Sequence, residues 1–455
     1  MKINVENWIT KHMEEIIKST QELVRIPSKQ GEPSLGAPFG EDVTKAIEAS
    51  LAIGKKYGME TRNMDGYIGL IDYGEGEEVL GIMCHVDVVP EGTGWKHPPY
   101  EAVIEDGILY GRGTLDDKGP AVSAIYALAA IKECGLKMKR KVRIMLGGNE
   151  ESGWGCMKHY GEHEKMPDLA FSPDADYPLV NSEKGIAHAT YACEYPSSIS
   201  LKGGTAGNVI CGKVEAELVG NFESISKIVE AFAEKTGFNC SVDKNGDKVG
   251  IRVIGVEGHA STPHVGKNAL QGMLCLLREI ELQPQDASII AALNDALKMD
   301  MHGESVGIDS SDESGRTTMT PSIIDWNENG FNLTVDMRIP ISVELNSVIN
   351  KLNDAFGVTN VVHTSLQPGH FVSRDSELVS KLLEVYANRT GEYLEPLAIG
   401  GGTYARAVPN AVAFGCERPG VPALIHMPNE SIRLEDIDFN TRMIADAIIA
   451  LACEE

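Results

Sequence analysis

Hydrophobic residues near the start of the chain recur at spacings of three and four, which places them on one face of a helix. This stripe runs from Trp8 to Val24, and Pro27 marks its end. Similar patterns predict three further helices, at residues 43–57, 378–389 and 434–451. Helices that each bury one face against a common core are typical of a layered α/β protein.

Short apolar runs bounded by glycine or charge predict strands between the first helices. They cover residues 67–72, 79–84, 108–110 and 142–146. The Ala- and Leu-rich segment 121–131 lies between two of these runs and predicts a buried helix. The alternation of strands and helices indicates an α/β domain with a central mixed sheet.

The pattern changes near residue 186, where strand, helix and strand begin to repeat. Predicted strands 213–219 and 251–256 flank a helix at 222–234, and strands 332–339 and 361–364 flank a helix at 343–355. The region resembles two copies of a split βαβ unit, the motif of ferredoxin-like folds. We therefore expect a catalytic domain in two parts, 1–186 and 372–455, interrupted by an α+β lid domain at 187–371 made of two ferredoxin-like halves.

Composition limits the possible partners. The 455 residues carry 41 Lys and Arg against 66 Asp and Glu, a formal net charge of −25. Such acidity argues against nucleic acid or an anionic membrane as a partner, because both carry negative phosphate. The nine cysteines are scattered without a CxxC pair, and no apolar run of membrane-spanning length or signal-peptide type occurs. We expect a cytoplasmic enzyme.

Residues that could do chemistry follow the predicted strands. Cys84-His85-Val86-Asp87 ends one strand, and side chains two residues apart point to the same face. His85 and Asp87 should therefore project together. Taken alone, this pair would more often be a structural hydrogen bond than a functional site.

Asp116 and Asp117 lie where a predicted strand meets the buried helix. Two adjacent carboxylates at such a junction are costly unless a cation neutralises them. The alternative is a capped helix with solvated aspartates, because Asp is a good N-cap residue. For Asp117 that alternative is competitive.

Carboxylates follow two more strands, as Glu150-Glu151 after residues 142–146 and as Asp174 after residues 169–171. Open α/β sheets bind ligands at the carboxyl ends of their strands. A lone Glu-Glu pair is most often solvated. One imidazole with several carboxylates, however, suits a divalent transition metal such as zinc or manganese.

These segments together resemble a known family. The strings HVDVVPEGTGW, GRGTLDDKGP, NEESG and SPDADYPLVNSEKG occur in this order. They resemble the dinuclear metallopeptidases that include aminoacylases, carnosinases and carboxypeptidases, and most closely the PepV-type bacterial dipeptidases. The resemblance covers nearly the whole chain.

The resemblance implies two divalent metal ions, with zinc expected first and manganese or cobalt as alternatives. Asp116 would bridge the ions. His85 and Asp174 would complete the protein ligands of one ion, and Glu151 and His426 those of the other. Without the resemblance, a late histidine in an apolar run such as 423–426 would more often be a core residue.

Two further residues have implied roles beside the metals. Asp87 would hold the His85 ring. Glu150 would be the general base that takes a proton from a metal-bridging water and later delivers it to the leaving amine.

The resemblance also implies substrate contacts. Asn208 and His259 would stabilise the oxyanion, while Arg338 and the loop Gly401-Gly402-Thr403 would bind the substrate carboxylate. Taken alone, Arg338 would be a surface salt bridge and the loop an ordinary turn.

The sequence thus predicts a dipeptidase that acts on small peptides with a free C-terminal carboxylate. An N-acyl amino acid deacylase is the alternative within the family, since an acyl group needs an apolar pocket where an amine needs a carboxylate. A non-catalytic peptide-binding metalloprotein is the alternative from another class. The length of the lid suggests a monomer by analogy.

Overall fold

The computed structural model describes residues 2–422 and 424–454. The chain divides into two compact units. The first contains Met1–Asn181, Val372–Leu397 and Gly402–Glu455, and the second contains Ser182–Phe371 with Ala398–Gly401. The second unit is therefore an insertion within the first.

A mixed sheet forms the centre of the first unit, with strand order β1-β2-β6-β3-β7-β22. The β1-β2 and β2-β6 pairs are antiparallel, whereas β3 pairs in parallel with β6 and β7, and β7 with β22. The strands are β1 (Glu60–Met64), β2 (Ile68–Tyr73), β3 (Val79–His85), β6 (Lys141–Gly147), β7 (Leu169–Ser172) and β22 (Ala411–Ala413). The predicted central mixed sheet is confirmed.

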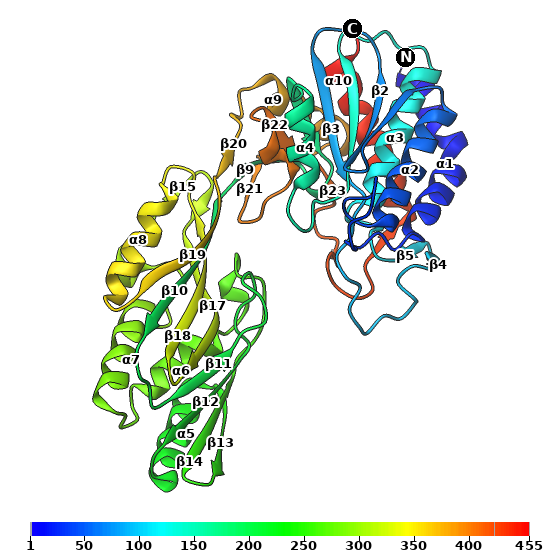
Figure 1. The fold of residues 1–455 in the computed structure, drawn as a ribbon. Coiled ribbons are helices and arrows are strands. Elements are labelled where there is room, and N and C mark those ends of the chain that lie inside the picture. Colours follow the sequence, from blue (N-terminus) through cyan, green and yellow to red (C-terminus); the bar gives the residue numbers. More distant parts are fainter. Residues whose placement is uncertain (1, 423, 455) are drawn as a thin grey trace. The chain divides into compact units, whose positions relative to one another are not determined.

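Helices pack around this sheet. They are α1 (Lys2–Val24), α2 (Glu41–Lys56), α3 (Lys118–Glu133), α4 (Gly155–His163), α9 (Glu377–Thr390) and α10 (Leu434–Ala452). Helix α3 is buried along most of its length and contacts α1, α10 and β3 (Figure 1). Its run of Ala, Leu and Ile explains this, because a helix that is apolar all round must be enclosed.

Short strands complete the first unit near the chemistry. β4 (Val103–Glu105), β5 (Ile108–Tyr110) and β24 (Ser431–Arg433) form one small sheet. β8 (Ala175–Asp176) and β23 (Cys416–Glu417) pair in parallel beyond the end of β7. These pairings bring segments from both ends of the chain together.

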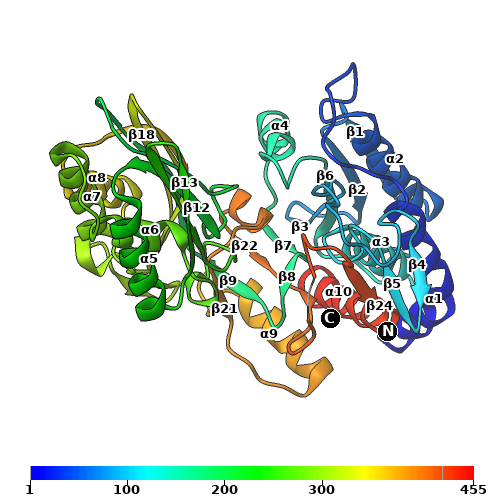
Figure 2. The same ribbon diagram turned by 90° about the horizontal axis from the view of Figure 1, so that it is seen from below.

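The second unit is built on an antiparallel sheet with strand order β13-β14-β12-β11-β17-β18-β10-β19. The strands are β10 (Gly185–Glu194), β11 (Ser200–Gly203), β12 (Lys213–Val219), β13 (Asn239–Asn245), β14 (Lys248–Ile254), β17 (Thr318–Asn327), β18 (Gly330–Ile339) and β19 (Asn360–Gln367). The helices α5 (Phe222–Thr236), α6 (Ala269–Leu277), α7 (Pro284–Leu297) and α8 (Leu345–Phe356) cover one face (Figure 2). Both predicted strand–helix–strand groups are present, and their strands join one sheet.

Candidate metal centre

The site lies where neighbouring parallel strands of the first unit end. His85 is the last residue of β3, and it pairs with Gly147, the last residue of β6. Glu150 and Glu151 follow β6, and Asp174 follows β7. Because the carboxyl ends of parallel strands meet at one edge of a sheet, these side chains lie together.

The first group of potential ligands contains His85, Asp116 and Asp174. The Nε2 atom of His85 lies 2.8 Å from Oδ1 of Asp116 and 3.7 Å from Oδ2 of Asp174. His85 is buried, and this nitrogen has no hydrogen-bond partner among the described residues. A buried nitrogen without a partner is costly, so the geometry fits an ion that would take its lone pair.

The second group contains Asp116, Glu151 and His426. His426 Nε2 lies 2.9 Å from Oδ2 of Asp116 and 3.1 Å from Oε2 of Glu151. Asp116 therefore offers one carboxylate oxygen to each group. This is the arrangement that a carboxylate bridging two ions requires.

The carboxylates of the site lie close together, and the side chains around them carry too little positive charge to balance them. Burial, with the neighbouring charge of Asp116, raises the pKa of Glu151 to about 7. The pKa of Asp174 is raised for the same two reasons, and burial raises the pKa of Glu150 well above its ordinary value. Divalent ions would supply the missing charge, and the nitrogen and oxygen donors present suit zinc, manganese or cobalt.

The histidines balance part of this charge only when they are protonated. Burial works against the charged form of His426, but hydrogen bonds to Asp116 and Glu151 raise its pKa to about 11. A protonated imidazole has no lone pair for a metal. Metal binding would therefore release protons from the site.

Asp87 fixes the backbone on both sides of the site. Its backbone oxygen lies 3.0 Å from Nδ1 of His85. Its carboxylate accepts the N–H groups of Glu150 at 3.0 Å and Glu151 at 3.1 Å. Oδ1 of the same carboxylate lies 3.5 Å from Nδ1 of His85. Asp87 therefore contacts the His85 ring through both its main chain and its side chain, and the side chain also orients the two glutamates.

Asp117 has a contact that the sequence did not indicate. It lies at the N-cap of α3 but makes no side-chain capping bond. Its carboxylate is buried and accepts the N–H of His85 at 3.0 Å. The alternative of a solvated aspartate that caps the helix does not hold for Asp117, because its carboxylate is buried and its donor is a strand residue 32 positions away.

Glu430 is a second functional candidate without a predicted role. Its buried carboxylate accepts the N–H groups of Gly113 and Leu115, both at 3.0 Å, and of Asp116 at 3.2 Å. It also pairs with Arg112 at 2.6 Å. The available signal was the Asn-Glu pair shortly after His426.

Some predicted substrate residues are neighbours within the second unit. The N–H of Ala260 donates to the backbone oxygen of Asn208 at 2.8 Å, which places His259 beside the Asn208 segment. His259 Nδ1 lies 2.6 Å from Oγ of Ser261. Their predicted contact with an oxyanion stays a prediction.

Arg338 is buried on β18 and has a salt-bridge partner. Its Nε and Nη2 each lie 2.9 Å from the carboxylate of Asp336, and its Nη1 donates to the backbone oxygen of Gly400 at 2.7 Å. Gly401 follows in the same unit, whereas Gly402 and Thr403 belong to the first unit. Thr403 Oγ1 accepts the N–H of Ala405, capping the short helix Tyr404–Ala407.

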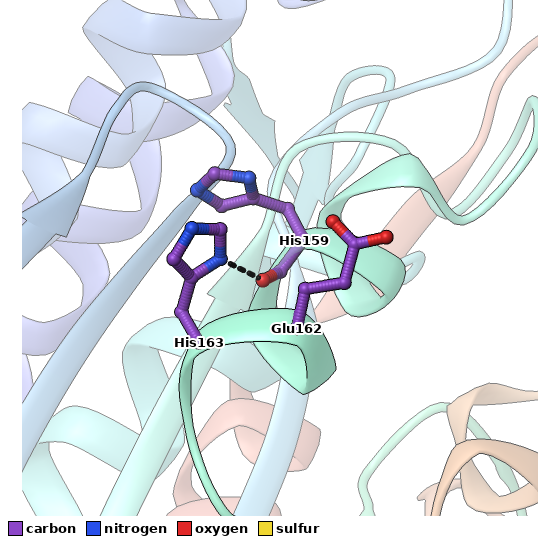
Figure 3. A group of neighbouring side chains, drawn as sticks. All are labelled: His159, Glu162 and His163. Atoms are coloured by element: carbon purple, nitrogen blue, oxygen red, sulfur yellow. Dashed lines mark hydrogen bonds between the residues drawn. The ribbon is translucent and has the colours of Figure 1, made fainter.

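A third group of potential ligands lies on α4. His159, Glu162 and His163 come from consecutive turns, and Figure 3 shows the two imidazole rings next to each other. His163 Nδ1 lies 2.8 Å from the backbone oxygen of His159, and the His159 ring stacks on Tyr67 at 4.1 Å. The buried Nε2 atom of His159 lies 3.3 Å from Oδ2 of Asp65. This group shares no residue with the other two.

Comparison with known families decides the classification. The model of peptidase family M20/M25/M40 matches residues 81–450. The chain belongs to this family. The predicted family resemblance is confirmed, and the M20 chain is a metallopeptidase. No described helix of this M20 chain is long and apolar enough to cross a membrane.

Curated relatives match along the full length. "Putative dipeptidase YtjP" of Bacillus subtilis is 35% identical over 98% of this chain and 100% of its own. "Beta-Ala-Xaa dipeptidase" of Lactobacillus delbrueckii subsp. lactis is 32% identical over 100% of both chains. Human carnosine dipeptidase 1 has the same fold, with a TM-score of 0.62 at 14% identity over 99% of this chain and 98% of its own.

Proposed function

We propose that this M20 metallopeptidase hydrolyses the peptide bond of dipeptides that carry a free C-terminal carboxylate. The full-length similarity to dipeptidases supports the substrate class. The single structural observation that carries the proposal is the shared Asp116 carboxylate, with one oxygen 2.8 Å from His85 and the other 2.9 Å from His426.

Two divalent ions would occupy the two groups. His85, Asp116 and Asp174 would hold one ion, and Asp116, Glu151 and His426 the other. Zinc is the first expectation for this donor set, with manganese and cobalt as alternatives. When bound, the ions would acidify a water and polarise the scissile carbonyl.

Glu150 is the proposed general base. It belongs to neither group of ligands, and its backbone is fixed by Asp87. Burial raises its pKa well above the ordinary value, which suits a group that must accept a proton and then donate it to the leaving amine.

The inserted unit would act as the substrate-binding lid. Asn208 and His259 would donate to the oxyanion. Arg338, with the backbone of Gly401 and Gly402 and the side chain of Thr403, would bind the C-terminal carboxylate. Three of the five N–H groups of Arg338 bond to described residues, one each from Nε, Nη1 and Nη2. One N–H on Nη1 and one on Nη2 are therefore left for a substrate.

The cysteines support a proposal about the compartment in which the protein works. All nine are free thiols, as in proteins of a reducing compartment, and we propose that the enzyme works in the cytoplasm as a monomer. A deacylase that removes N-acyl groups remains the alternative within the family. The presence of Glu150 beside a ligand weighs against a non-catalytic binding protein, because binding requires no proton acceptor.

One experiment tests these proposals together. Metal-free protein is assayed on a panel of dipeptides and N-acetyl amino acids while zinc, manganese or cobalt is added in turn. We expect no turnover without metal and dipeptide hydrolysis with two ions per chain. Hydrolysis by verified metal-free protein would overturn the metal proposal, and a preference for N-acetyl amino acids would identify a deacylase.

A further inference from the structure

A cavity of about 230 Å³ lies in the first unit next to the metal ligands. Its wall includes Leu115, which directly precedes Asp116, and Glu417 of β23. Much of the remaining wall is apolar, with Ile108, Val421 and Pro422 contributing side chains. The other charged residues of the wall are paired with one another, since Arg418 and Arg433 both donate to Asp436. A cavity that combines apolar surface with a few placed polar groups is typical of small-molecule recognition.

Glu417 lies beside the segment that carries a metal ligand. β23 pairs in parallel with β8, and Glu417 is opposite Asp176. Asp176 is two residues beyond Asp174. The pairing therefore places the carboxylates of Asp176 and Glu417 near the segment that carries Asp174. Neither of them belongs to a group of potential metal ligands.

The charged groups around Glu417 are mostly acidic. Burial, followed by the charges of Asp176, Asp174 and Asp116, raises the pKa of Glu417 to about 7. Its neighbour Arg418 is engaged elsewhere, since its guanidinium donates to Asp436 at 3.2 Å and lies over the Phe439 ring at 4.5 Å. Arg418 is therefore paired with Asp436 rather than with Glu417.

The Glu417 carboxylate lacks a compensating partner. Within residues 2–422 and 424–454, no side chain forms a hydrogen bond or ion pair with it. The two metal ions would offset the charge of their own ligands. They would leave the half-buried Glu417, which lines the cavity, and the exposed Asp176 opposite it on β8 as acceptors for a further cation.

A dipeptide supplies such a cation. Its N-terminal ammonium group is separated from the scissile carbonyl by the carbons of one residue, so it must lie close to the metals when that bond is cleaved. Asp87 is not available for this role, because its two carboxylate oxygens accept the N–H groups of Glu150 and Glu151.

We propose that Glu417, together with Asp176, binds the ammonium group of the substrate's N-terminal residue. The apolar wall of the cavity then accommodates the side chain of that residue. An N-acyl group carries no charge and would leave the half-buried Glu417 carboxylate uncompensated, so this residue makes the site selective for free dipeptides. The inference rests on the proposed dipeptidase function and identifies its specificity determinants.

The test compares alanyl-leucine with propionyl-leucine, which differ only in the amine. The wild type, Glu417→Gln, Asp176→Asn and the control Glu60→Gln are assayed with metal content measured in each. Glu60 is exposed on β1 at the sheet edge. We expect Glu417→Gln to lower kcat/KM for alanyl-leucine by ten-fold or more through KM, with less than a two-fold change for propionyl-leucine. Asp176→Asn should act in the same direction.

The outcomes separate this inference from the function on which it rests. At full metal content, an equal fall in kcat/KM for both substrates would overturn the amine-binding role alone. So would a ratio of the two kcat/KM values that stays as in the wild type in both variants. A wild type that fails to cleave alanyl-leucine, or that prefers propionyl-leucine, would overturn the dipeptidase proposal itself. A direct measurement is the inhibition constant of an amino-alkylphosphonate and of its analogue without the amine. Glu417→Gln should weaken inhibition by the amino compound and leave inhibition by the analogue unchanged.

Discussion

The Glu430 carboxylate accepts the backbone N–H of Asp116 at 3.2 Å, although 314 residues separate them in sequence. Glu430 follows His426 by four positions. One short segment therefore provides a potential ligand and also anchors the loop that carries the shared carboxylate. Tight metal binding should depend on this anchor.

We predict that Glu430→Gln weakens metal binding. Glutamine keeps an acceptor oxygen but loses the charge that pairs with Arg112, so the Asp116 loop is held less firmly. Residues that orient ligands typically contribute about 10–100-fold to metal affinity. Competition with a chelator measures the change, and Glu435→Gln on the exposed start of α10 is the matched control. Wild-type affinity in Glu430→Gln would show that the anchor does not matter.

Glu150→Gln should separate catalysis from metal binding. Removing a general base typically costs about 10²–10⁴-fold in rate. We expect kcat to fall by at least this factor while two ions remain bound, because Glu150 is in neither ligand group. Elemental analysis and steady-state kinetics together provide the measurement. Normal turnover with full metal content would remove Glu150 from the mechanism.

Arg338→Lys should change the recognition of the substrate carboxylate. Lysine keeps the charge opposite Asp336 but loses the planar fork of donors. We expect kcat/KM for a dipeptide to fall by about ten-fold or more, as for one lost charge-assisted bond, with little change for the same dipeptide as its C-terminal amide. Equal losses for the acid and the amide would indicate that Arg338 acts only by holding Asp336.

A buried ion pair predicts how stability depends on pH. Asp72 on β2 accepts two hydrogen bonds from Arg143 on β6, at 2.8 and 2.7 Å. Burial alone would raise the pKa of Asp72, but the bonds from Arg143 and Lys141 outweigh it and lower the pKa. This contribution to stability is full above the unfolded pKa of about 4 and is lost as pH falls through the lower folded value.

Asp72→Asn should therefore destabilise the protein most at neutral pH. Breaking a buried pair costs about 3 kcal/mol, and this difference from wild type should shrink as pH falls below about 4. Urea unfolding at pH 7 and at pH 3 measures both values. Asp106→Asn, at an exposed position, is the control. A difference that does not change with pH would exclude this linkage.

The fold was predictable where the local pattern is strong. Helix α3 and strand β6 are predominantly apolar and were predicted from their sequences. Strand β1 was missed because its sequence, Glu-Thr-Arg-Asn-Met, belongs to a half-exposed edge strand. Helix α4 was missed because its nine residues are largely polar and its periodicity is weak.

Predicting the candidate site depended on a different kind of information. His85, Asp116 and Asp174 were found because each follows a strand or precedes a helix in a recognisable string. Asp117 and Glu430 were not, because their partners are backbone N–H groups that only the folded chain brings near. Side-chain chemistry can be read from sequence, whereas main-chain donors carry no residue-specific signal.

The hydrogen bonds of Asp87 have an evolutionary consequence. One carboxylate holds the main chain of both the proposed base and a proposed metal ligand. A substitution of Asp87 would disturb both roles at once, whereas a substitution of Glu150 would remove only one. A descendant of this enzyme that gives up hydrolysis but keeps its metals should therefore retain the aspartate and lose the glutamate.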